Sequence, residues 1–382
     1  MTKLIPYGHQ LIDDDDVKSV IKVLKSGWLT QGPTILKFEK KLASYVKSKY
    51  AVAVSSGTAA LHLSCLAAGI GPSDEVIVPT LSFVATANCV LYCGAKPVLV
   101  DIYNDTLTID VEETKKKITE KTKAIIAVDF AGHPAGWDKL KELAKKYNLI
   151  LIDDAAHAVG SQYQGKMIGS IVDLTCFSFH PVKTITTGEG GAITTNNKVY
   201  FERLKRLRHH GIYKNSILSK KYGGWFYQIN ELGYNYRMTD IQAALGISQL
   251  KKIDKFIKRR REIWQKYNKA LGKIKGLTLP KEKRGSFSAW HLYTLRIDEK
   301  VLGKTRKKLY DQLRNADIGV QVHYIPIHMH DLYRKRFGVK GDDFRVAEQY
   351  YKEAISLPIF PKLTNQEQEF VIKILRKIIG TQ

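Results

Sequence analysis

The sequence is poor in cysteine and has no long apolar run. Its four cysteines are Cys65, Cys89, Cys93 and Cys176. They form no C-x-x-C pair, and two of them lie in apolar, helix-like segments. This pattern favours reduced packing residues over a disulfide framework. No apolar stretch approaches the roughly 18 residues that a membrane-spanning helix needs, and the first residues lack a signal-peptide core. We therefore expect a cytoplasmic protein.

Acidic residues are also scarce: 37 Asp and Glu stand against 61 Lys and Arg, a formal net charge of +24. Such an excess commonly indicates nucleic acid, an anionic membrane or anionic substrates as partners. Here the basic residues are spread along the chain, as in 251–261, where apolar residues recur at helical intervals. No basic tail, zinc-finger pattern or RNA-binding motif accompanies them. The pattern favours solvated helix faces and predicts neither a nucleic-acid nor a membrane partner.

Repeats and low-complexity tracts are absent, and 44% hydrophobic with 26% charged residues is ordinary globular usage. Short apolar runs alternate with helical patterns over the first part of the chain. The strand-like runs are 51–54, 76–78, 97–100, 124–128 and 149–152, and the helical ones 58–68, 83–92 and 137–147. This alternation predicts an α/β fold with a largely parallel sheet, whose ligands lie beyond the carboxyl ends of the strands.

The later part of the chain has a different order of elements. Helical patterns at 239–250 and 254–271 precede a strand-like run at 291–297, a helix at 304–315 and a final helix near 366–379. We predict a large domain over 1–250 and a smaller α+β domain over 251–382.

Three segments of the first domain could carry chemistry. Residues 55–61 join a buried strand to a helix, where free N–H groups could bind a phosphate, although an ordinary helix cap at Ser56 or Thr58 also explains them. Asp153 and Asp154 end an apolar strand, which suits a helix cap or a carboxylate paired with a protonated ring nitrogen.

The third segment is the loop 180–190, which connects two strand-like runs and contains Lys183. A lone lysine is usually a surface residue, but an amine in a confined site becomes a nucleophile. An anion-binding loop, a strand-end carboxylate and a loop lysine, in this order on a parallel sheet, match the needs of pyridoxal 5'-phosphate (PLP).

The motifs themselves resemble those of the PLP-dependent sugar aminotransferases of the DegT and StrS family. These enzymes carry Gly-Thr-Ala-Ala-Leu, Asp-Ala-Ala-His-Ala and Ser-Phe-His-x-x-Lys, found here at 57–61, 154–158 and 178–183. The resemblance continues through 188–192, 232–238 and 322–328. It implies the type I aminotransferase fold with a mostly parallel seven-stranded sheet, a homodimer with shared active sites and a Schiff base on Lys183.

The resemblance also implies roles for individual residues around the cofactor. Asp154 is expected to pair with the pyridine nitrogen, Phe83 to stack on the ring and His157 to lie near the ring hydroxyl. The phosphate is expected to be held by Gly57, Thr58 and Ser178, with Asn235 reaching in from the partner subunit.

Substrate contacts implied by the resemblance lie in three places: Tyr7; Gly27, Trp28, Leu29 and Thr30; and His323, Tyr324, Ile325 and Pro326. Packing is the alternative explanation for Tyr7. A metal site at His323, His328 and His330 is disfavoured, because no carboxylate or cysteine stands at a familiar ligand spacing.

Within the family, 225–227, 231–237 and 354–360 most resemble the pseudaminic acid branch. Its enzymes aminate a UDP-linked 4-keto-6-deoxy-N-acetylhexosamine, with L-glutamate as the expected donor. One alternative is an aminotransferase of the same family that acts on another keto nucleotide sugar. Another, a nucleic-acid-binding regulator on this fold, predicts a missing lysine or an added DNA-binding module. A nicotinamide dehydrogenase is disfavoured, because 69–74 lacks the third glycine of the dinucleotide fingerprint.

Overall fold

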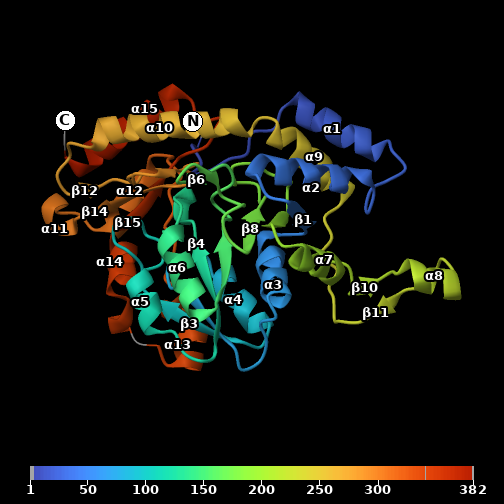
Figure 1. The fold of residues 1–382 in the computed structure, drawn as a ribbon. Coiled ribbons are helices and arrows are strands. Elements are labelled where there is room, and N and C mark those ends of the chain that lie inside the picture. Colours follow the sequence, from blue (N-terminus) through green and yellow to red (C-terminus); the bar gives the residue numbers. More distant parts are fainter. Residues whose placement is uncertain (1–3, 340, 381–382) are drawn as a thin grey trace.

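A seven-stranded sheet runs through the larger part of the molecule (Figure 1). The computed structural model describes residues 4–339 and 341–380. In spatial order the strands are β1 Tyr50–Val54, β9 Gly191–Thr195, β8 Leu174–Ser178, β5 Ile150–Asp154, β4 Thr122–Val128, β2 Glu75–Pro79 and β3 Lys96–Val100. Strand β9 is antiparallel to β1 and β8, and the other neighbours pair in parallel. The predicted mostly parallel sheet is confirmed.

Helices cover both faces of this sheet, and successive strand residues face opposite layers. Val52 and Val54 pack in one core cluster, with α3 (Gly57–Ala67), α4 (Ala85–Tyr92) and α7 (Lys198–Leu207). Ala51 and Ala53 pack in the other, with α2 (Pro33–Val46), α5 (Val111–Lys116), α6 (Trp137–Tyr147) and α9 (Asp240–Leu250). Burial on both faces explains why the strands read as continuous apolar runs instead of alternating patterns.

The N-terminal helix α1 (Asp14–Leu24) begins in the acidic run of the sequence. Asp13 and Asp16 form a capping box, each side chain accepting the other residue's backbone N–H. Asp16 also accepts a hydrogen bond from Gln249 at 2.7 Å, which fixes α1 to the end of α9. The four cysteines are buried and free, as predicted.

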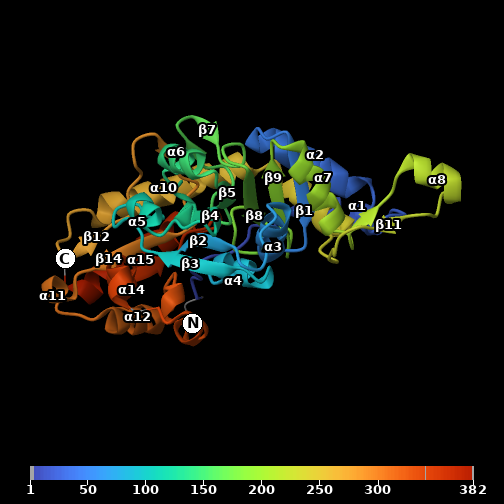
Figure 2. The same cartoon turned by 60° about the horizontal axis from the view of Figure 1, so that its bottom comes forward.

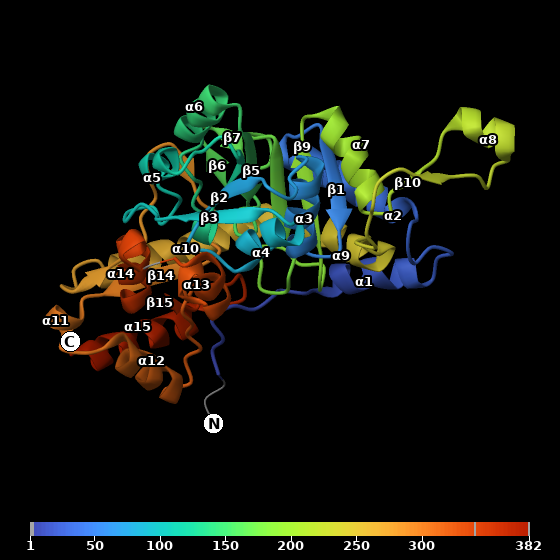
Figure 3. The same cartoon turned by 90° about the horizontal axis from the view of Figure 1, so that it is seen from below.

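The C-terminal elements form a third core cluster. Its sheet has the order β12-β14-β15, with β12 Leu277–Thr278, β14 Tyr293–Ile297 and β15 Ala354–Leu357. The helices α12 (Arg306–Asn315) and α15 (Asn365–Ile379) pack on it, together with Ile5 of the N-terminal segment. Figure 3 shows these elements gathered at one side of the large sheet.

One helix belongs to both parts of the molecule. The 19-residue α10 (Ile253–Leu271) places Ile253 and Phe256 in the core of the large sheet and Tyr267 and Leu271 in the C-terminal core. In Figure 1 it lies along α15 across the top of the view. The domain boundary at residue 250 stays a prediction.

An arm projects from the body between α7 and α9 (Figures 1 and 2). It consists of the paired strands β10 (Ile212–Tyr213) and β11 (Gln228–Ile229), with helix α8 (Ser216–Tyr222) at its tip. Large apolar side chains of this arm and the segment after it are exposed: Ile217, Tyr222, Trp225, Tyr227, Ile229 and Leu232.

Smaller elements complete the chain. The short strands β6 Gln162–Tyr163, β7 Lys166–Met167 and β13 Ser286–Phe287 form a sheet of their own, and the remaining helices are α11 Glu299–Leu302, α13 Asp331–Phe337 and α14 Arg345–Glu353. Within residues 4–339 and 341–380, none of the helices combines the length and apolar character that a membrane crossing requires.

Candidate active site

A cavity of about 360 Å³ opens beyond the carboxyl ends of β1, β4, β5 and β8, the edge of the sheet where a ligand is expected. It is lined by residues from separate segments: Tyr7, Ser56, Gly57, Thr58, Leu61, Ser82, Phe83, Ala85, Val128, Asp154, Ala156, His157, Ser178, His180, Val182, Lys183, Glu189, His291, His323 and Tyr324. A larger open groove of about 1010 Å³ lies beside α2, α9 and α10, and none of the predicted site residues lines it.

Lys183 projects into the cavity from the loop after β8. Its backbone N–H donates to the carbonyl of His180 at 2.9 Å, which fixes a tight turn. Burial lowers the pKa of the Lys183 amine to about 8; the carboxylate of Asp154 opposes this shift, and the Arg260 guanidinium adds to it. About a tenth of the amine is therefore in the free, nucleophilic form at pH 7, far more than in an ordinary lysine.

Asp154 ends the neighbouring strand β5 and lies in the same cavity. Its Oδ2 accepts a hydrogen bond from the Thr86 hydroxyl at 2.6 Å, and its Oδ1 accepts one from the Ala156 N–H at 3.3 Å. Burial raises the pKa of this carboxyl, whereas the bond from Thr86 and the nearby Lys183 lower it. The adjacent Asp153 is also buried but does not line the cavity, as strand alternation requires.

The N-terminus of α3 forms another wall. Ser56 is the helix cap, accepting a bond from the Ala59 N–H at 3.0 Å, so one of the predicted alternatives for this segment is realised. The helix approaches β8 so closely that a Cβ at Gly57 would lie 2.9 Å from the Cβ of Ser178. A Cβ at Gly191 would lie 2.3 Å from the Ser56 carbonyl oxygen. These glycines leave the first N–H groups of the helix beside the Ser178 hydroxyl, an arrangement that suits an anion.

His157 and Tyr324 are linked across the cavity. The Nδ1 of His157 accepts a hydrogen bond from the Ala131 N–H at 3.2 Å, and its Nε2 lies 3.2 Å from the Tyr324 hydroxyl. Burial and the nearby Lys183 hold the pKa of His157 well below its ordinary value, so the ring is neutral. Nε2 therefore carries the ring proton and donates a hydrogen bond to the Tyr324 hydroxyl oxygen. The hydroxyl hydrogen of Tyr324 remains available to a ligand.

The other predicted residues separate into two groups. Tyr7, Phe83 and His323 line the cavity, with the rings of Tyr7 and His323 5.4 Å apart. Outside it lie Asn235, which is exposed, and the following predicted contacts: Gly27, Trp28, Leu29, Thr30, Ile325 and Pro326. Ile325 and Pro326 directly follow the lining residue Tyr324 without lining the cavity themselves, whereas a single chain does not bring Asn235 and 27–30 to the cofactor residues.

Several lining residues were not predicted as site residues. His180 and Glu189 belong to the loop 180–190, so the length of that loop was a usable signal. His291 is the first residue of the strand-like run 291–297, and nothing in the sequence around it indicates a site residue.

The cavity has the features that PLP requires. A buried carboxylate can face a ring nitrogen, a helix N-terminus that only glycine permits can face a phosphate, and a lysine amine of lowered pKa lines the same cavity. Fold and site together define a PLP-dependent aminotransferase of fold type I.

The chain belongs to the DegT/DnrJ/EryC1/StrS aminotransferase family, whose model matches residues 10–376. It is 42% identical to the spore coat polysaccharide biosynthesis protein SpsC of Bacillus subtilis, over 98% of this chain and 97% of that protein. It is 40% identical to the UDP-4-amino-4,6-dideoxy-N-acetyl-beta-L-altrosamine transaminase of Campylobacter jejuni, over 98% of both. The structure of Helicobacter pylori PseC, an aminotransferase of pseudaminic acid biosynthesis, superposes with a TM-score of 0.92 at 34% identity, covering 99% of this chain and 100% of that one.

Proposed function

We propose that this protein transfers the amino group of L-glutamate to the C4 ketone of a UDP-linked 4-keto-6-deoxy-N-acetylhexosamine. The observation that carries the proposal is the meeting of Lys183, Asp154 and the N-terminus of α3 in one cavity. The similarity to the Campylobacter jejuni transaminase and to PseC supports the choice of sugar.

In this proposal the chain's own residues hold the cofactor on three sides. Asp154 keeps the ring nitrogen protonated, the N–H groups of Gly57 and Thr58 with the Ser178 hydroxyl bind the phosphate, and Phe83 covers the ring. The bound cofactor supplies an electron sink for the pair left when a proton departs from carbon. His157 and Tyr324 present a hydroxyl hydrogen toward the ligand.

Lys183 has two tasks. As a free amine it anchors the cofactor covalently, and when the amino donor displaces it, it becomes a base within the cavity. It takes the proton from the donor α-carbon, and in the second half of the cycle it delivers a proton to the sugar carbon. Its lowered pKa suits both directions, because an amine that titrates near neutral pH both accepts and releases a proton readily.

The part of the site that one chain leaves open is assigned to a second subunit. Thr30 pairs with Thr239, and the Leu29 carbonyl accepts a hydrogen bond from the Asp240 N–H at 3.0 Å. The segment 27–30 therefore contacts residues that follow Asn235 by only four or five positions. Five of the predicted contacts missing from the cavity, 27–30 and Asn235, are thus gathered at another place on the same chain, near the base of the arm. A symmetric dimer would bring this surface to the partner's cavity.

The decisive experiment incubates the purified protein with L-glutamate and a panel of 4-keto and 3-keto nucleotide sugars, with products identified by mass spectrometry and NMR. We expect a 4-amino-4,6-dideoxy-N-acetylhexosamine linked to UDP, together with 2-oxoglutarate. The SpsC similarity supports the second candidate, amination of another keto nucleotide sugar, and the same panel distinguishes the two. Failure to aminate any sugar of the panel contradicts the proposal.

A further inference from the structure

His291 is a cavity residue to which neither the motifs nor the proposed chemistry assigns a task. Only 4% of it is exposed, and it lines the cavity that holds Lys183. Its ring centroid lies 4.5 Å from that of His157. The ring nitrogens of His291 form no hydrogen bond within the described part of the chain, and Nδ1 is fully enclosed. Because Nδ1 is enclosed, Nε2 is the ring nitrogen that is left for a ligand in the cavity, and a buried polar ring without a protein partner points to such a ligand.

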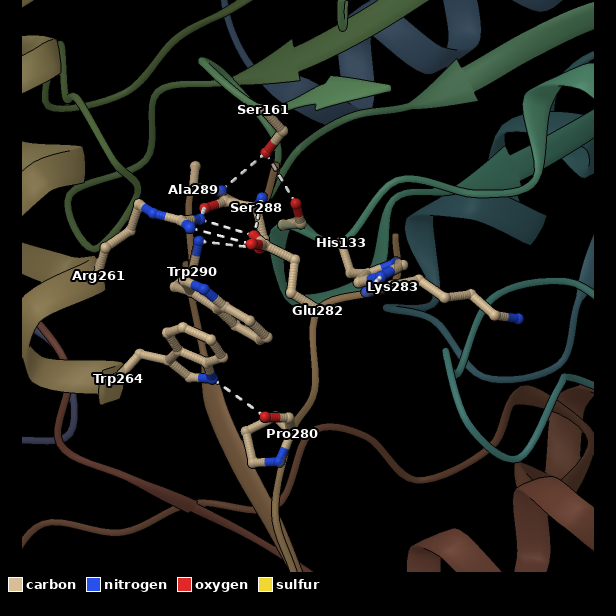
Figure 4. A network of polar contacts seen from close by, with 11 residues as sticks. His133, Ser161, Arg261, Trp264, Pro280, Glu282, Lys283, Ser288, Ala289 and Trp290 are labelled. Carbon is tan, nitrogen blue, oxygen red and sulfur yellow. Dashed lines mark hydrogen bonds and ion pairs between the residues drawn. The ribbon is translucent and has the colours of Figure 1, made fainter. Parts of the chain in front are cut away.

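The backbone around His291 is held firmly in place. The residue before it, Trp290, has a left-handed φ of 46°, a strained conformation for a bulky residue that persists only where the surroundings enforce it. The enforcing contacts are visible in Figure 4. The Trp290 ring stacks on Trp264 at 4.7 Å, and the Trp290 N–H donates to the Ser288 hydroxyl at 3.1 Å.

Further contacts of the same network lock the segment 288–290 (Figure 4). The Ala289 N–H donates to Ser161 Oγ at 3.0 Å. Glu282 accepts hydrogen bonds from the Ser288 N–H at 2.7 Å and from Nη1 and Nη2 of the Arg261 guanidinium, at 2.6 and 2.9 Å. The strained turn is thus fixed from α10, from the loop that follows β5 and from Glu282, and it directs the next residue, His291, into the cavity.

A buried cation lies directly behind His291. Arg260 is completely inaccessible, and its Nη1 donates to the carbonyl oxygens of His291 at 3.1 Å and Ile359 at 2.9 Å. Its Nε and Nη2 have no partner, and no ion pair of Arg260 with a carboxylate is found among the described residues. A buried charge without a counter-ion is costly and makes its surroundings favourable to an anion.

We propose that His291 donates a hydrogen bond to a carboxylate of the amino donor, while Arg260 fixes the His291 backbone and supplies a positive field behind it. The inference rests on the proposed function in that an amino acid is the donor. Within the nucleotide sugar, the hexose that carries the ketone is neutral and the charge lies on the UDP diphosphate, whereas the donor and its 2-oxo product carry carboxylates on the carbon chain that reacts. A positive field beside the cavity that holds Lys183 therefore favours the donor over the hexose, and a neutral imidazole N–H bonds most strongly to an anion.

The test compares binding of glutarate, a dicarboxylate without an amine, to the PLP-loaded parental protein and its variants by calorimetry. His291→Phe keeps a ring of similar size but no nitrogen, and we expect glutarate to bind roughly ten- to a hundredfold more weakly. His291→Gln, whose amide reaches the place of Nε2, should retain more affinity than His291→Asn, whose amide reaches only the place of Nδ1. These two variants carry the test if the Phe variant fails to fold.

The matched control is His62→Phe. His62 is equally buried, at 4% exposure, and also has an unpartnered ring nitrogen, but it does not line the cavity. We expect its affinity for glutarate to stay at the parental value. Arg260→Lys should preserve more of the glutarate affinity than Arg260→Met, because it keeps the charge.

Single-turnover half-reactions separate this inference from the proposed function. His291→Phe should raise the apparent Kd for L-glutamate and leave the half-reaction with the keto sugar within about threefold of the parent. Unchanged glutarate binding in His291→Phe, no glutarate binding by the parental protein, or an equal loss in both half-reactions overturns the inference. Failure of the parental protein to aminate any keto sugar would instead contradict the proposed function.

Discussion

Around Lys183 and Asp154 the chain supplies its own partners: Thr86 and Ala156 bond the carboxylate, and the amine is enclosed by loop and strand. Along the arm the opposite holds, since Trp225 is 79% exposed and Leu232 beyond β11 equally so. A monomer rarely leaves such apolar side chains to water without a reason. The contrast is what the proposal above requires, in which one chain builds the chemical half of the site and a second subunit covers the arm.

Of the substitutions around Lys183 and Asp154, Lys183→Ala is expected to have the largest effect on activity. The variant should fold, bind PLP without a covalent link and lose roughly 10⁴-fold or more in turnover, because nucleophile and proton carrier disappear together. Product formation by mass spectrometry and the absorbance of the bound cofactor measure the two effects. Turnover near the parental rate would remove Lys183 from the chemistry.

The next largest effect is expected for Asp154→Asn, which should retain PLP and lose roughly 10²- to 10³-fold in turnover. A neutral amide does not hold the ring nitrogen protonated. Asp153→Asn is the matched control, because burial raises the pKa of Asp153 well above its ordinary value and an amide resembles the neutral acid. Similar losses in both variants would contradict the special role of Asp154.

Mixing two inactive variants tests whether the exposed half serves a partner. We expect Asn235→Ala to lose most of its activity and to recover it in hybrids with Lys183→Ala. Random exchange at equal amounts makes half of the dimers hybrid, each with one intact site, so about a quarter of the parental activity should return. Verified subunit exchange without recovery would place Asn235 in its own chain's packing.

The smallest effect concerns pH and the buried amine. Because the pKa of Lys183 is lowered to about 8, the free amine is about a tenth of the total at pH 7 and half at pH 8. Covalent capture of PLP by cofactor-free protein needs the free amine, so its rate should rise about fivefold between pH 7 and 8, more steeply at lower pH, and level off above about pH 9.

Rapid-mixing absorbance measurements at pH 6.5–9.5 check this profile. Asp154→Asn should move the midpoint downward, because the carboxylate that favours the charged amine is gone. A rate that still climbs steeply at pH 9.5 would show an ordinary, unshifted lysine.

How far the sequence predicted the structure differs between the two halves. Lys183, Asp154 and Gly57 lie in short motifs whose local order already implies a strand end, a loop and a helix start, so both their elements and their meeting in one cavity could be anticipated. The sheet could be predicted as well, because strands that are buried on both faces produce apolar runs in the sequence.

His291 and the arm could not be predicted in this way. His291 reaches the cavity through a left-handed Trp290 and through contacts such as that of Ala289 with Ser161, 128 positions earlier in the chain. Arg260 looks like one more basic residue of an amphipathic helix. The arm consists of two-residue strands and a seven-residue helix, too short for periodicity to reveal. Its exposed aromatic residues acquire meaning only when their surroundings are known.

Helix α10 has a mechanical consequence. It is a rod of about 28 Å whose two ends are rooted in different hydrophobic interiors, with the inaccessible Arg260 between them. If one of the two hydrophobic cores unfolds, α10 unfolds with it, and the other core loses the apolar side chains that α10 contributes. The two parts should therefore unfold in a single calorimetric transition on heating. A chain cut at residue 250 should lose the α10 side chains that pack on one face of the large sheet and should not yield a stable fragment.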